Sequence, residues 1–410
     1  MSAVGAIGKV GKLAVTSGAL AASATAVSKL VACVGLGYWA ADVGVLDPAS
    51  CATLSRLIFA IFQPALLLVN VASTLASPTE SISTLALIPA FALAQITLGA
   101  VVGSLVVRAL RLNPKTVDGR ELRMSCSFAN SGPLPLLFAD ALFRTSADRT
   151  LAPRAVAFIS FYLLGWSPAF WTVGRNMLSP PSSGSDSGER SEKPPLVSKA
   201  RLQLVLSNPQ TKRILSPPVM GCLLGAVIGG VPILRKTFLG STAPLRPITD
   251  SLSTLGQAYL PAVILTLAGT LHQVLNAGKA RSTTDTGAAA AATAGSTSSS
   301  SPYKREGVSL ATKVGALSLA RFVAMPLAGL GLLAAGTRIG FIPRNDPLLR
   351  FILLMEACMP SAQNSVVILQ LDKDVEGAGS MAKTISALYI TAVLPIAILL
   401  SLSSMHAGLI

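Results

Sequence analysis

Charged residues are scarce in this chain, and histidine is almost absent. Asp, Glu, Lys and Arg together make up 12% of the 410 residues, against about 25% in an ordinary soluble domain. Hydrophobic residues make up 51% of the chain. Such a composition excludes a soluble domain with a single anchor, and it predicts a protein that crosses a membrane many times.

Several signatures of chemistry are missing as well. Two histidines in the whole chain exclude the histidine-rich metal boxes of membrane enzymes. No Walker A, GxSxG, HExxH or GxGD sequence occurs. The five cysteines form no CxxC pair, so neither a disulfide framework nor a zinc site is supported. We therefore expect no enzyme activity, no cofactor and no bound metal.

The chain does have an excess of positive charge, with a formal net charge of +15. A strongly basic chain can indicate a nucleic-acid partner. Here, however, the Lys and Arg residues are spread over the connections and the ends of apolar runs, which is the distribution that the positive-inside rule predicts. We therefore expect a lipid bilayer as the partner, and no nucleic acid.

Ten apolar runs, each about 20 residues long and sufficient to cross a bilayer as a helix, recur along the chain. They cover residues 21–43, 53–75, 83–107, 122–143, 153–174, 213–233, 249–275, 310–336, 349–371 and 381–403.

The arrangement of these runs predicts two five-helix halves. We expect an N-terminal extension or targeting segment at 1–20, a first half at 21–175, a cytosolic Ser-, Pro- and charge-rich linker at 176–212, a second half at 213–403 with a low-complexity loop at 277–308, and a tail at 404–410. An odd number of spans in each half makes the halves insert in opposite orientations. The predicted fold is thus all-α and polytopic, a ten-helix 5 + 5 inverted repeat like that of NhaA and the bile-acid symporters.

The fourth and ninth runs both carry proline beside asparagine near the middle. Proline removes a backbone donor and clashes with the preceding turn, so a helix usually opens there. The freed backbone groups must find partners or line a polar cavity. Matched breaks in two halves are typical of a transporter with a midplane site, and two kinked structural helices are the alternative. The residues expected to form the breaks are Gly132, Pro133, Pro135 and Pro360.

The two asparagines, Asn130 and Asn364, are the best candidates for substrate contacts. An amide offers two donors and two acceptor lone pairs without the desolvation cost of a charge. Ser131 and Gln363 lie beside them and are expected to share the lining. The positive dipole ends of half-helices favour a small organic anion as substrate. The alternative is that each asparagine only fills the broken helix.

Three charged residues inside the apolar runs have open roles, because a charge is costly within a bilayer. Glu356 lies one turn before Pro360, where it either binds a coupling proton or cation or braces the break. Arg321 either attracts an anionic substrate or pairs with Glu356 or a helix C-terminus. Asp140 either contributes to the site or simply reaches the interface.

Glycines at intervals of four residues predict close helix contacts in two of the runs. Whether these contacts lie within one protomer or between two is not readable from their spacing. The glycines are Gly221, Gly225 and Gly229 in the sixth run, and Gly99 and Gly103 in the third.

The two breaks resemble those of the auxin efflux carrier superfamily, and within it the PIN-LIKES branch. Residues 129–136, ANSGPLPL, are similar to the branch's GN-x-GN-LPL, and residues 359–364, MPSAQN, to its MP-x-A-x-N. The resemblance extends over most of the chain except the first twenty residues and the two linkers. The chain departs from it at Pro133, which stands where the family usually has a second asparagine, and in the third run, which has no acidic residue.

The resemblance implies a homodimer whose protomers have a scaffold domain and a moving transport domain, an elevator-like motion, and a substrate site lined by Asn130 and Asn364. It implies the endoplasmic reticulum more than the plasma membrane. We therefore expect a secondary carrier of a small organic anion such as an indole carboxylate. The alternatives are a sodium- or proton-coupled organic anion symporter of the bile-acid type, and a membrane receptor or regulator that does not transport.

Overall fold

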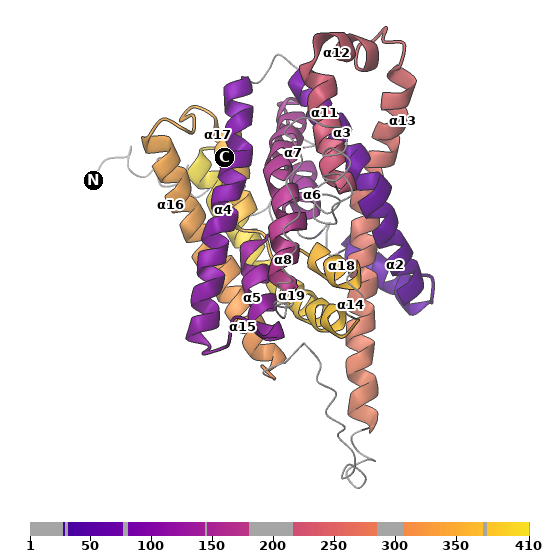
Figure 1. Cartoon of the computed structure of the whole chain (residues 1–410), viewed down its shortest axis with the longest axis vertical. Helices are drawn as coiled ribbons and strands as arrows, with labels where there is room; N and C mark the ends of the chain where they lie inside the picture. Colours follow the sequence, from indigo (N-terminus) through magenta and orange to yellow (C-terminus); the bar gives the residue numbers. More distant parts are fainter. Residues whose placement is uncertain are drawn as a thin grey trace, which may run out of the picture.

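The structure is a computed structural model that describes residues 28, 32–76, 81–143, 146–179, 216–284, 307–371 and 375–409. Its regular structure is helical, apart from one isolated bridge (Figure 1). Residues 32–42 form the first described helix. The next helices are α2 (Pro48–Leu57), the π-helical segment η1 (Ile58–Phe62), α3 (Gln63–Ala76), α4 (Ile82–Ala109), α5 (Val117–Ser127), α6 (Pro133–Phe143), α7 (Leu151–Ala169), η2 (Phe170–Gly174) and α8 (Arg175–Leu178).

The remaining helices follow the first predicted linker. They are α11 (Pro217–Gly230), α12 (Pro232–Phe238), α13 (Arg246–Gln257), α14 (Tyr259–Thr284), α15 (Leu310–Leu319), η3 (Ala320–Ala324), α16 (Met325–Arg338), α17 (Pro347–Ala357), α18 (Asn364–Leu371) and α19 (Val375–Ala407). Helix α14 therefore continues to Thr284, into the stretch predicted as a loop at 277–308. The extension at 1–20 and most of the linker at 176–212 lie outside the described residues.

Six of the helical stretches are long and apolar enough to cross a membrane, and the bent pair α11–α12, with an angle of 103° between its helices, makes a seventh. This confirms the prediction of an all-α polytopic membrane protein. The half-helices α5, α6, α17 and α18 have only 8 to 11 residues each, or roughly 12 to 17 Å at 1.5 Å per residue. None of them spans a core of about 30 Å alone, so the count of ten spans and the 5 + 5 repeat stay predictions.

Proline positions explain where several helices start or widen. Pro133 begins α6 and Pro135 lies in its first turn, so the first break comes just before the prolines, at residues 128–132. Proline is tolerated there because first-turn N–H groups have no partner within the helix. Pro64 and Pro326 come just after η1 and η3. A proline ring in a helix normally clashes with the carbonyl four residues earlier. For both prolines that carbonyl lies in the π-helical segment, whose wider turn makes room for the ring.

The predicted glycine contacts lie within one protomer. The glycines of α11 face the backbone of α3, and those of α4 face the backbone of α5. On α11 the spacing of four is matched by its partner, since Gly221, Gly225 and Gly229 lie over Pro64, Leu68 and Ala72. These three glycines therefore bring the backbones of α11 and α3 together over more than two helical turns.

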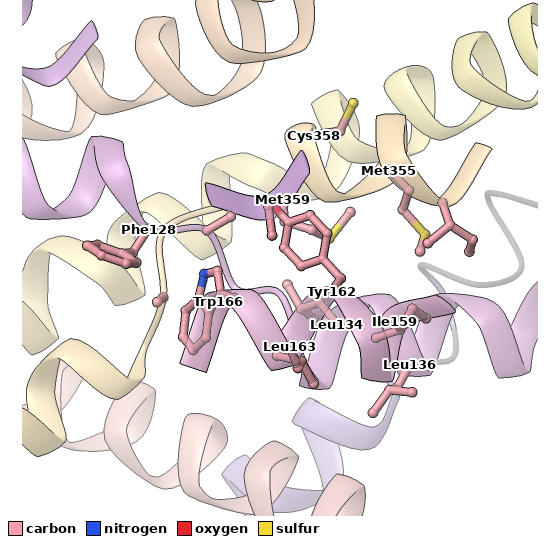
Figure 2. Packing of buried hydrophobic residues seen from close by; sticks show 14 of the residues in the cluster. Phe128, Leu134, Leu136, Ile159, Tyr162, Leu163, Trp166, Met355, Cys358 and Met359 are labelled. Carbon is pink, nitrogen blue, oxygen red and sulfur yellow. The ribbon is translucent and has the colours of Figure 1, made fainter. Parts of the chain in front are cut away.

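The helices form two packed groups. We call α2, η1, α3, α11, α13 and α14 the outer group, because α3 packs against α11 and α13 while α14 packs against α2. We call α4 to α8 and α15 to α19, with η2 and η3, the crossing group. Much of the buried apolar core belongs to the crossing group. Figure 2 shows part of it, with Leu134, Tyr162 and Trp166 gathered near Met355 and Met359.

Candidate functional site

The two breaks pair with each other through the backbone. The N–H of Asn130 donates to the carbonyl of Pro360 at 2.7 Å, and the N–H of Ala362 donates to the carbonyl of Phe128 at 2.9 Å. Ala129 and Ser361 form an antiparallel bridge between these bonds. An opened helix leaves backbone N–H and C=O groups without partners. In hydrocarbon each such group costs roughly several kcal/mol. Each break therefore supplies the partners that the other one needs.

Arg321 joins the ends of the two half-helices that lead into the crossing. Its Nη1 donates to the carbonyl of Cys126 at 3.0 Å, and its Nε donates to the carbonyl of Met359 at 2.9 Å, with Nη2 donating to the same oxygen. The residue is 1% exposed. Carbonyls at a helix C-terminus carry partial negative charge and lack partners within the helix. Arg321 therefore contacts the C-terminal end of α5 and the backbone just beyond α17.

Asn130 is held inside the crossing by a tyrosine. Its Nδ2 donates to the hydroxyl of Tyr389 on α19, and that hydroxyl donates to the carbonyl of Ser361 at 3.1 Å. The Ser361 hydroxyl in turn donates to the carbonyl of Ser125 at 2.7 Å. These bonds join the two breaks to each other and to α5 and α19.

Glu356 lies near the end of α17 and is fully buried. No Lys or Arg in the described parts of the chain comes within ion-pair distance of its carboxyl. The donors of Arg321 are directed to Met359 and Cys126 instead. Among the described residues, Glu356 and Arg321 thus form no direct ion pair, and the role of Glu356, whether bracing or coupling, stays a prediction.

We expect Glu356→Gln to leave the melting temperature of the purified protein within a few degrees of the wild type, because the amide keeps the shape of the carboxyl and no ion pair is lost. Flux at several imposed pH gradients then separates the two open roles. A bracing side chain leaves the pH dependence unchanged, whereas loss of the response to the gradient would show that Glu356 carries a coupling proton.

A cavity of about 620 Å³ lies between the outer group and the crossing group. Its walls come from α2, η1, α3 and α14 on one side and from η2, α18 and α19 on the other. Gln363 and Asn364 of the second break line it. Phe59 and Trp171, whose ring centroids are 4.5 Å apart, meet across the boundary between the groups.

A second, much smaller space lies at the crossing itself. With about 10 Å³ available, it is at the lower limit for one water molecule. Asn130, Ser131, Gly132 and Pro133 line it, together with Gln63, Gln363 and Asn364, which line both spaces. The predicted substrate contacts are thus brought together, with Gln363 and Asn364 facing the large cavity and Asn130 and Ser131 the small one.

The open polar groups at the site belong mostly to the second break. Pro133 and Pro135 have no N–H, so the start of α6 offers few of the donors that a helix N-terminus usually presents. Gln363 Oε1 is buried without a hydrogen-bond partner among the described residues. The Asn364 side chain, which begins α18, also forms no hydrogen bond with them. The start of α6 is therefore a poor anion site, and an anion site at the start of α18 stays a prediction.

A family model described as "Membrane transport protein" matches residues 22–400. The match covers nearly the whole chain and includes both breaks. The chain belongs to this membrane transport family. It is an integral membrane protein of a transporter family, and the expected resemblance to auxin efflux carriers is confirmed.

Proteins of Arabidopsis thaliana are similar to this chain, two of those named here over most of its length. Protein PIN-LIKES 1 is 23% identical over 374 residues, which are 85% of this chain and 72% of that protein. Protein PIN-LIKES 5 is 24% identical over 357 residues, 78% of this chain and 81% of that protein. Protein PIN-LIKES 2 is 33% identical over a shorter stretch, 40% of this chain and 29% of its own length. Together they indicate a membrane transporter of the auxin efflux type.

One buried cluster in this family member was missed by sequence reasoning. Lys313 on α15 forms ion pairs with Asp118 and Glu121 on α5, and Ser380 on α19 donates to Glu121. Lys313 looks like a charge at the end of an apolar run, yet it is 4% exposed. The available signal was the pair of acids three residues apart, which share a helix face. Asp140, by contrast, is exposed on α6, away from the crossing cavities.

Proposed function

We propose that this protein is a secondary carrier that moves a small organic anion, such as an indole carboxylate, by alternating access of an elevator type. The observation that carries the proposal is the cavity between the two helix groups, which ends at the crossing of the two breaks. Its volume of about 620 Å³ falls within the range of roughly 300–1,000 Å³ that is usual for small-ligand sites.

The internal bonding of the crossing group supports a rigid moving unit. The bridge between the breaks, the Arg321 contacts and the Tyr389 contacts all join parts of that group to each other. The boundary with the outer group, by contrast, contains the cavity and apolar contacts such as Phe59 with Trp171. A sliding motion along this boundary would carry Gln363 and Asn364 together with a bound substrate.

The lining supports a flat organic molecule with few polar groups. The lining combines aromatic and aliphatic side chains with a few hydroxyls, Arg56, and the amides of Gln63, Gln273, Gln363 and Asn364. Amides at fixed positions orient a ligand, while the apolar wall supplies contact area. We propose, on the family resemblance, that the carrier works as a homodimer and resides in the endoplasmic reticulum membrane.

Flux into proteoliposomes tests the carrier. We expect purified protein to give saturable uptake of radiolabelled indole-3-acetate that is abolished by excess unlabelled substrate. Uptake that requires a sodium or proton gradient would indicate the symporter alternative. Binding without flux, in vesicles where a known carrier is active, would indicate a receptor or regulator.

The two asparagines should respond differently to truncation, because one faces the cavity and the other holds the crossing. Asn364→Ala should weaken substrate affinity roughly ten- to hundredfold, the effect of losing a hydrogen bond worth about 1–3 kcal/mol, with little change in melting temperature. Asn130→Ala, by contrast, should lower the melting temperature, because the Tyr389 hydroxyl loses the hydrogen bond that it accepts from Asn130. Normal affinity in Asn364→Ala would contradict the assignment of the site.

A further inference from the structure

One face of the helix that runs from α2 through η1 to α3 places a cation at the large cavity. Ala52, Arg56, Phe59 and Gln63 are three or four residues apart, so they lie on one side of the continuous helix α2–η1–α3, and all four line the cavity. Arg56 is the one charged side chain among the described residues that line it. Arg56 forms no ion pair or hydrogen bond with any of those residues.

The other strong cation near the site is already engaged. The donors of Arg321 point to backbone carbonyls in the crossing, and Arg321 lines neither cavity. The start of α6 is poor in donors because of Pro133 and Pro135. The crossing therefore offers neutral amides to a ligand, and the positive charge comes from the opposite wall.

We propose that Arg56 binds the carboxylate of the transported anion, while the amides of the second break contact the other end of the molecule. This inference rests on the proposed function, and it adds the side chain that would recognise the negative charge of the substrate. Arg56 precedes Gln63 by seven residues, which is about 10 Å along a helix, and Gln63 lines the space at the crossing. Phe59 lies between them on the helix, in contact with Trp171 of η2, and both aromatic side chains line the cavity. A planar guanidinium suits a carboxylate because it can donate two parallel hydrogen bonds.

The test compares an acid with its neutral amide in equilibrium binding to the purified full-length protein. We expect the wild type to bind indole-3-acetate about ten- to a hundredfold more tightly than indole-3-acetamide, in line with a charge-assisted bond. Arg56→Gln should bind the acid as weakly as the amide, with the affinity for the amide unchanged. Arg56→Lys should keep part of the preference, since it retains the charge without the planar fork.

The matched control is Arg108→Gln, which removes an exposed arginine at the end of α4 that does not line the cavity. This variant should bind both probes as the wild type does. Acid preference that survives in Arg56→Gln would overturn the inference while leaving the carrier intact. A wild type that binds no organic anion would overturn the proposed function and the inference together.

A lipid phosphate is the other anion that an exposed arginine can hold. In that case phosphatidylglycerol would raise the melting temperature of the wild type but not of Arg56→Gln, and both proteins would prefer the acid equally. This outcome overturns the inference. Arg56 is exposed on its helix, so neither substitution is expected to impair folding, and melting curves without ligand check this directly.

Discussion

Arg321→Leu should be strongly destabilising, lowering the free energy of unfolding by about 2–6 kcal/mol. The substitution leaves the carbonyls of Cys126 and Met359 buried without their donors, and each lost partner costs about 1–3 kcal/mol. It also removes the positive charge that lies at the C-terminal ends of two half-helices. The measurement is the thermal unfolding of the purified protein in detergent, followed by intrinsic fluorescence or by loss of monodispersity.

Two further variants define the cause of that loss. Arg321→Lys keeps the charge, but a single ammonium group cannot match a guanidinium that contacts two carbonyls from the two different breaks, so an intermediate melting temperature is expected. Arg338→Gln removes an exposed arginine at the end of α16 and should melt as the wild type does. A wild-type melting temperature for Arg321→Leu would show that the crossing does not depend on this contact.

Gly225→Val should destabilise the protein by about 3 kcal/mol, because overpacking of a close contact typically costs 1–3 kcal/mol and sometimes more. A Cβ atom at this position would lie 2.6 Å from the carbonyl oxygen of Leu68 and 3.0 Å from its Cα. Both atoms belong to the backbone of α3, so neither moves aside unless the two helices separate. Thermal unfolding of the purified variant gives the size of the effect.

Gly315→Val provides the matched comparison. Gly315 lies inside α15, and a Cβ atom there meets nothing within 4 Å. Valine at this position should change stability by less than about 1 kcal/mol, since intrinsic helix propensities differ by no more than that. Equal melting temperatures for the two valine variants would mean that the contact between α11 and α3 contributes little to the fold.

The sequence was sufficient to predict the fold class and the two breaks. Prolines beside asparagines mark an opened helix on local grounds alone, and the glycine spacing marks a close contact. Neither signal predicts which other segment the break or the glycines contact. Ala129 pairs with Ser361 through backbone atoms. The residue types at these two positions therefore do not predict the pairing. The break itself falls before Pro133, because a first-turn proline is compatible with α6.

The roles of buried charges were harder to predict for a related reason. Arg321 was expected to find a substrate, an acid or a helix end, and its partners are carbonyls that become free only once both helices have opened. Which carbonyls these are depends on the crossing geometry, not on sequence spacing. Lys313 lies near the start of an apolar run, and nothing nearby in the sequence points to its acids, which lie on α5.

The pairing of the two breaks constrains how this protein is made. Synthesis proceeds from the N-terminus, so the first break enters the bilayer before the second break has been synthesised. Until residues 360–362 emerge, the carbonyl of Phe128 and the N–H of Asn130 have no backbone partner. Until the second half is made, these unpaired backbone groups of the first half must therefore be kept out of the lipid by the insertion machinery. Nascent chains cut short before α17 should be retained by the translocon and degraded, even though most of their hydrophobic segments are complete.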